Sequence, residues 1–157
     1  MVPGAVELRL RPASGGDFQF CWSLYRDSMK SLTMELLQYW NESGQRRMVE
    51  ETITDSGTSI IVSSGSGIGW LQISETPEEI YLGQLYVTPS MQNRGIGTAV
   101  VRRLCDRASQ QRKALTLEVM KNNRARLLYE RLGFDPVGSS KYKFNMRWQR
   151  GHQSSDN

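Results

Sequence analysis

Alternating apolar and polar positions predict strands at both ends of the chain. Val6–Arg11 alternates with period two, and so does 141–148. Between them, the apolar runs 58–64, 67–75 and 78–87 follow one another with only short turns. These three strands should be antiparallel, because parallel neighbours need a long crossover connection. The continuous apolar run 114–120 is typical of a buried strand.

Four other segments repeat their apolar residues at helical spacing. The first begins near Asp17, a suitable helix cap, and the second covers 42–53. A third runs from about Gly97 to Arg112, and a fourth ends at Gly133. The predicted fold is α/β (α+β), with helices packed on a mixed sheet. No repeat or linker divides the chain, so we predict one domain over 1–150 and a polar tail over 151–157.

Composition narrows the function classes. The chain has 157 residues, is 38% hydrophobic and 23% charged, and carries a formal net charge of +4. No apolar run suits a membrane span, and the N-terminus lacks the apolar region of a signal peptide, which predicts a cytoplasmic protein. The scattered basic residues predict no nucleic-acid partner. Cys21 and Cys105 are expected to be buried, and a single histidine cannot build a metal site.

The segment QNRGIGTAV, Gln92 to Val100, is typical of a phosphate-binding loop. Glycines let the backbone pass close to a ligand, and free N–H groups at a helix N-terminus attract an anion. A Walker loop is excluded because no lysine follows Gly97. A dinucleotide fingerprint is excluded because Val100 is too bulky at its third small position. An acyl-CoA pyrophosphate loop and a simple glycine-rich helix start remain open.

The sequences around this loop carry a family resemblance. LYVTPSMQNRGIGTAVVRRL (85–104) and NNRARLLYERLGF (122–134) resemble the two signature blocks of the GNAT superfamily of N-acetyltransferases. One strand fits between the blocks, as in the family. The resemblance covers about Arg9 to Trp148 and is specific over Leu85 to Phe134.

This resemblance implies a fold and a cofactor. The fold is a mostly antiparallel sheet of about six or seven strands with about four helices, and the strands at 79–88 and 114–120 splay apart. The cofactor is acetyl-CoA, whose pantetheine arm lies in that splay. The implied cofactor-binding residues are Leu85, Tyr86, Val87, Gln92, Asn93, Arg94, Gly95, Ile96, Gly97, Thr98, Asn123, Arg126 and Tyr129.

Acetyl transfer to an amine requires three chemical tasks. Backbone amides near Leu85 would stabilise the oxyanion, by family analogy. Tyr129 matches the family's tyrosine that protonates the leaving thiolate, although its ring could instead simply pack in the core. Asn123 matches the residue that binds the pantetheine arm, and it also suits a helix cap. Arg94 and Arg126 are cofactor-phosphate contacts or solvated surface charges.

The third task, removing the ammonium proton, has several candidate groups. Many relatives carry a glutamate inside the strand at 78–87, but here that part offers only Tyr81 and Gln84. Glu35 ranks first, because it lies in the variable segment that lines the acceptor site in the superfamily. Glu118 is another candidate, although strand alternation points it away from the core. Trp40 is a candidate for a side chain that lines the acceptor site, or else a core residue.

The predicted protein is therefore an acyltransferase that moves acetyl groups to a primary amine in a ternary complex. Its catalytic residues are predicted as Tyr129, Glu35 and Gln84, and its substrate contacts as Glu35, Trp40 and Tyr81. A small amine is the favoured acceptor, and a protein N-terminus or lysine is the alternative. A non-catalytic acyl-CoA sensor on the same fold stays open. Pairing of the strand at 141–148 with a second chain would give a homodimer.

Overall fold

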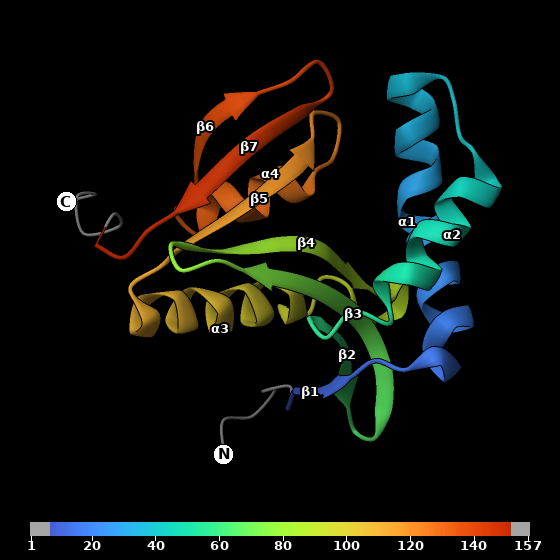
Figure 1. The fold of residues 1–157 in the computed structure, drawn as a ribbon, viewed down its shortest axis with the longest axis horizontal. Coiled ribbons are helices and arrows are strands. Elements are labelled where there is room, and N and C mark those ends of the chain that lie inside the picture. The colour runs from blue at the N-terminus through green and yellow to red at the C-terminus, as the bar shows by residue number, and fades with distance from the viewer. Residues whose placement is uncertain (1–6, 152–157) are drawn as a thin grey trace. The chain divides into compact units, whose positions relative to one another are not determined.

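The structure is a computed structural model that describes residues 7–151 (Figure 1). The predicted tail therefore lies outside the described residues except for Gly151. Apart from β6, the elements follow the predicted order: β1 (Arg9–Pro12), α1 (Phe18–Leu37), α2 (Glu42–Thr52), β2 (Thr58–Ser63), β3 (Ser66–Glu75), β4 (Glu79–Val87), α3 (Ile96–Gln111), β5 (Ala114–Met120), α4 (Ala125–Arg131), β6 (Asp135–Ser139) and β7 (Lys143–Trp148).

Strand β6 is the element that the sequence pattern did not predict. Its sequence, DPVGS, contains Pro136 and Gly138, both of which are poor strand formers. It pairs antiparallel with β7 and shifts register between these two residues. Proline is tolerated there because an edge strand leaves one row of backbone groups unpaired.

Strand pairing gives the sheet order β1-β2-β3-β4-β5-β7-β6. β1 with β2, β2 with β3, β5 with β7, and β6 with β7 pair antiparallel, whereas β4 and β5 are parallel. The predicted splay is present: the β4–β5 register runs from Glu79 opposite Ala114 only to Leu82 opposite Leu117. The predicted mixed, mostly antiparallel sheet is confirmed.

Strand β7 has a neighbour on each side, β5 and β6. The predicted pairing of segment 141–148 with a second chain is therefore wrong, because both of its edges are already hydrogen-bonded within the chain. Homodimer formation through another surface stays a prediction.

The chain packs as two compact units, which we describe separately. The first unit covers 7–72 and 84–97, and the second covers 73–83 and 98–151. The core of the first unit brings α1 and α2 onto the strands. Its buried members are Cys21, Trp22, Leu24, Tyr25, Val49, Ile53, Ile60, Val62 and Trp70.

The entry into α1 is held by an ion pair rather than by the predicted cap. The Asp17 side chain makes no capping bond to α1. Instead Arg11 donates to both of its carboxylate oxygens, at 3.0 and 2.8 Å. This contact holds the pKa of Asp17 below its usual value. The ion pair therefore ties the start of α1 to β1.

In the second unit, apolar faces of β4, β5 and β7 form a buried core. Ile80 and Leu115 are completely buried, and Met146 and Trp148 are nearly so. α4 ends at Arg131, and Gly133, just beyond the C-cap residue Leu132, has a φ of 98°, the left-handed conformation expected of glycine after a helix C-terminus. Both cysteines are free and buried, as predicted, and burial raises the pKa of each thiol to about 12.

Candidate functional site

The glycine loop of the first unit begins with a side-chain brace. Gln92 donates from Nε2 to the Val87 carbonyl at 2.8 Å, which ties the loop to the end of β4. Asn93 and Gly95 then take positive φ values of 62° and 77°. Gly95 meets this requirement at least cost because it has no Cβ.

The same loop presents unpaired donors. Within residues 7–151, the backbone N–H groups of Asn93, Arg94 and Gly95 have no hydrogen-bond partner. All three residues are exposed, and a Cβ placed on Gly95 would meet no atom within 4 Å. Helix α3 begins immediately afterwards, at Ile96. Free amides around an open surface at a helix start fit a phosphate group.

Asn123 and Arg126 lie at the start of α4, in the second unit. The Asn123 side-chain oxygen accepts the Ala125 N–H at 2.9 Å, although the N-cap position of α4 is the next residue, Arg124. Arg126 donates to Glu130 at 2.8 Å, and its guanidinium lies 5.5 Å from the centre of the Phe144 ring. Arg126 is therefore held against α4 and β7 rather than extended into solvent.

Tyr129 is buried on α4, with its ring 5.5 Å from that of Phe134. Within the described residues no group hydrogen-bonds its hydroxyl. Burial raises the pKa of Tyr129 to about 12, so the phenol keeps its proton at neutral pH. A buried phenol that is protonated and unpaired can donate that proton to a ligand.

The first-unit part of β4 carries Gln84, Leu85 and Tyr86. Gln84 is half-buried, accepts the Tyr86 hydroxyl at 2.5 Å and donates weakly to the Met48 sulfur at 3.9 Å. The Tyr86 ring packs on Tyr25 and Trp70, with centroids 5.5 and 5.3 Å away. The side chain of Tyr86 thus belongs to an aromatic cluster of the first unit, and only its backbone is left for the predicted cofactor contact.

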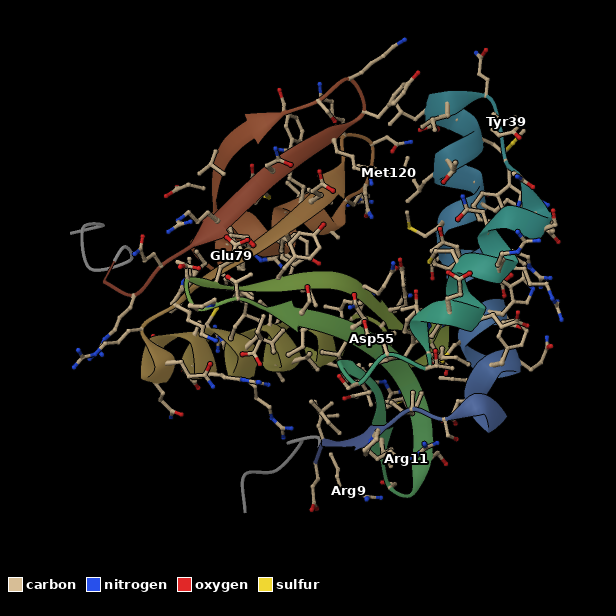
Figure 2. All side chains as sticks on the ribbon, viewed as in Figure 1. Arg9, Arg11, Tyr39, Asp55, Glu79 and Met120 are labelled. Atoms are coloured by element: carbon tan, nitrogen blue, oxygen red, sulfur yellow. The ribbon has the colours of Figure 1, made fainter. Side chains whose placement is uncertain are left out.

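The predicted acceptor segment spans the end of α1 and the start of α2. Glu35 is exposed on α1. Trp40 stacks on Tyr25 at 6.0 Å and donates to Glu42 at 2.8 Å, so it is a partly buried member of the aromatic cluster. Tyr39 is 64% exposed where the chain leaves α1 (Figure 2).

Sequence reasoning missed a polar bridge in this segment. The Tyr25 hydroxyl donates to Gln45 at 2.6 Å and joins α1 to α2. Tyr25 lies at helical spacing from Phe18 and Trp22, which indicates a core position, but nothing in the sequence pairs it with a glutamine 20 positions later. Burial raises the pKa of Tyr25 to about 12, which keeps this hydroxyl a donor.

A second polar pair lies on the strands of the second unit. The Tyr81 hydroxyl, on β4, donates to Glu118 Oε1 on β5 at 3.3 Å. Lys143 Nζ lies 4.0 Å from the same oxygen. Glu118 is exposed, as strand alternation predicted. Tyr81 and Glu118 were separate candidates in the sequence, and the structure brings them together.

The family model of the acetyltransferase (GNAT) family matches residues 20–134. The chain belongs to the GNAT acetyltransferase family. Acetyl-CoA is the acetyl donor of this family, and the chain is accordingly an acetyltransferase in general class. The glycine loop and the α4 block both lie inside the matched range.

Solved structures share the fold of this GNAT chain. The PaiA N-acetyltransferase of Thermoplasma acidophilum, in complex with coenzyme A, is 16% identical with a TM-score of 0.71, over 91% of this chain and 99% of that one. Ard1 of Thermoplasma volcanium is 16% identical with a TM-score of 0.67, over 90% and 97%. Mutant forms of the spermidine/spermine N-acetyltransferase SpeG of Vibrio cholerae are 18% identical with a TM-score of 0.65, over 96% and 98%.

A search of curated protein sequences finds no match to this GNAT chain. Across residues 7–151, none of the helices is both long enough and apolar enough to cross a membrane. Over the same described residues, no group of three or more His, Cys, Asp or Glu side chains is arranged to hold a metal ion.

Proposed function

We propose that this protein is an N-acetyltransferase that transfers the acetyl group of acetyl-CoA to a primary amine by direct attack in a ternary complex. The observation that carries the proposal is the loop at Asn93–Gly95, with three unpaired backbone N–H groups beside an open surface. These amides, and the first residues of α3, would hold the pyrophosphate, and the Gln92 brace would keep the loop in place.

When bound, acetyl-CoA supplies an activated thioester carbonyl. A deprotonated amine nitrogen attacks that carbon, and the carbon–sulfur bond breaks. The backbone N–H of Leu85 is proposed to donate to the carbonyl oxygen as negative charge develops there. Tyr129 would then give its hydroxyl proton to the leaving sulfur. Its pKa of about 12 keeps the phenol protonated until the sulfur leaves.

The acceptor is proposed to be a small amine that the α1–α2 segment recognises. Glu35 supplies an exposed negative charge on that segment, and Tyr39 and the partly buried Trp40 supply aromatic side chains in the same segment. Carboxylates and aromatic faces both attract ammonium groups. The fold shared with a spermidine/spermine N-acetyltransferase supports a small amine over a protein N-terminus or lysine.

The test is amine-dependent release of free thiol from acetyl-CoA, with the acetylated product identified by mass spectrometry. The amines are spermidine, tyramine and a short lysine-containing peptide. We expect thiol release to exceed the amine-free rate for at least one small amine. Stabilisation by CoA without thiol release on any amine would instead identify a non-catalytic acyl-CoA sensor, and faster reaction of the peptide would overturn the small-amine assignment.

A further inference from the structure

Tyr81 and Glu118 lie where the paired part of β4 and β5 ends. The last register pair is Leu82 with Leu117, and Tyr81 precedes it by one residue while Glu118 follows it by one. Figure 2 labels Glu79 at the start of β4 and Met120 at the end of β5. The polar pair therefore sits at the opening of the splay.

The face of the strands that carries this pair is polar. Strand alternation places Tyr81, Thr116 and Glu118 on one face, opposite the buried side chains of Leu82 and Leu117. The Thr116 hydroxyl oxygen is buried and has no hydrogen-bond partner among residues 7–151. Buried polar atoms are rarely left without a partner, so this oxygen points to a water or ligand group at the same place.

The Tyr81 hydroxyl and the Glu118 carboxylate have different roles in proton transfer. Burial, and secondarily the negative charge of Glu118, raises the pKa of Tyr81 to about 12; Glu79 adds a smaller effect in the same direction. Tyr81 therefore stays a donor and cannot serve as the base. The carboxylate of Glu118 is the proton acceptor of the pair.

One carboxylate oxygen is left available. Tyr81 and Lys143 both contact Glu118 Oε1, at 3.3 and 4.0 Å. Within the described residues nothing is hydrogen-bonded to Oε2. The Glu118 side chain is 42% exposed, so a proton taken up there can pass on to bulk water.

We propose that Glu118 is the general base of the reaction and that Tyr81 is its positioning residue. This inference rests on the proposed function and supplies the base that β4 itself lacks. Glu118 Oε2 takes one proton from the alkylammonium, directly or through one water, and the freed lone pair forms the new carbon–nitrogen bond. The carbon–sulfur electrons leave with sulfur, which takes the Tyr129 proton. Bond formation leaves the nitrogen positively charged, and it gives its remaining extra proton to water to form the neutral amide. The proton held by Glu118 passes through water and restores the phenol.

The decisive variant is Glu118→Gln, which keeps the shape of the side chain but cannot accept the proton. Its kcat should fall about a hundredfold on the fastest amine of the panel, with CoA affinity unchanged. Glu50→Gln is the matched control, because Glu50 is an exposed glutamate of α2, and it should keep the parent rate. Thermal melting of both variants should match the parent.

A second substrate separates proton removal from other roles. Trifluoroethylamine is largely unprotonated at neutral pH and needs no base before attack. The hundredfold loss in Glu118→Gln should shrink to less than about threefold with this amine. An equal loss with both amines would show that Glu118 acts on structure or binding, and would overturn the assignment.

Tyr81→Phe tests the positioning role. It removes one donor from Glu118, so kcat should fall about fivefold with the protonated amine but less than about twofold with trifluoroethylamine, because only the proton-removal step depends on how Glu118 is held. An equal fall with both amines would indicate a packing role only.

The outcomes also separate this inference from the proposed function. An active parent whose rate survives Glu118→Gln leaves the N-acetyltransferase in place and overturns the base assignment. A parent that binds CoA but releases no thiol on any amine overturns the proposed function and this inference with it.

Discussion

Two regions of this protein present their functional groups in different ways. They are the acetyl-CoA blocks, which are the signature blocks at 85–104 and 122–134, and the acceptor segment at 28–45. The loop Gln92–Gly97 is proposed to bind through its main chain, since it has two positive φ angles and three free N–H groups. The proposed acceptor segment, Ser28–Gln45, depends instead on side chains that meet distant partners, as Gln45 meets Tyr25.

This difference explains why one half of the reaction is easier to infer than the other. A main-chain anion site needs glycines at set places, and these are visible in any sequence that contains it. A side-chain site depends on which residues the fold brings together. A family can therefore keep its acetyl donor while its acceptors vary, because the acceptor segment changes without touching the loop.

The largest expected effect lies in the acetyl-CoA blocks, at Tyr129. Tyr129→Phe removes the hydroxyl and keeps the ring contact with Phe134. We expect kcat to fall about a hundredfold, with CoA affinity within threefold of the parent, because only the proton donor is lost. Steady-state thiol release and CoA calorimetry measure the two quantities. An unchanged kcat would mean that Tyr129 only packs in the core.

The next effect is at Gly95, and the chain supplies its control. Gly95 and Gly65 have φ values of 77° and 79°, and an added Cβ meets nothing within 4 Å at either one. Gly95→Ala and Gly65→Ala should therefore each lose about 1 kcal/mol of unfolding free energy. Only Gly95→Ala should weaken CoA binding, by about thirtyfold. Equal CoA affinity in the two variants would remove the loop from the binding site.

The smallest expected effect lies in the acceptor segment, at Glu35. Glu35→Gln removes the exposed charge of the acceptor segment. We expect turnover of the best small amine to fall at least about tenfold, mainly through a higher KM, while CoA affinity stays at the parent value. Glu50→Gln is again the matched control. An unchanged KM and kcat would show that Glu35 is a solvated surface charge.

The parts of the fold that the sequence predicted are those with local signals. Helical stripes, strand alternation and Gly133 as a helix stop all depend on neighbours in the chain, and the structure confirms them. β6 escaped prediction because its strand character comes from pairing with β7, against the preferences of Pro136 and Gly138. The dimer strand was wrong for the same reason, since β6 covers the edge that was expected to be free.

The candidate site residues also divide into those with local sequence signals and those that meet only through the fold. The turn at the glycine loop and the Asn123 contact with the start of α4 could be expected from the sequence, because both depend on residues close together in the chain. The pairing of Tyr81 with Glu118 could not, because these residues lie 37 positions apart and meet only through the β4–β5 register. Trp40 was expected to line the acceptor site or to lie in the core, and its stack on Tyr25 places it partly in the core.

The most direct measurement is a titration of isotope-labelled protein with CoA, followed through the backbone amide signals by NMR. If the free N–H groups of the loop hold the pyrophosphate, the amides of Asn93, Arg94 and Gly95 should shift together and saturate at the calorimetric affinity. The Gly65 amide should not move. Saturable CoA binding that leaves these three loop amides unshifted would contradict the account.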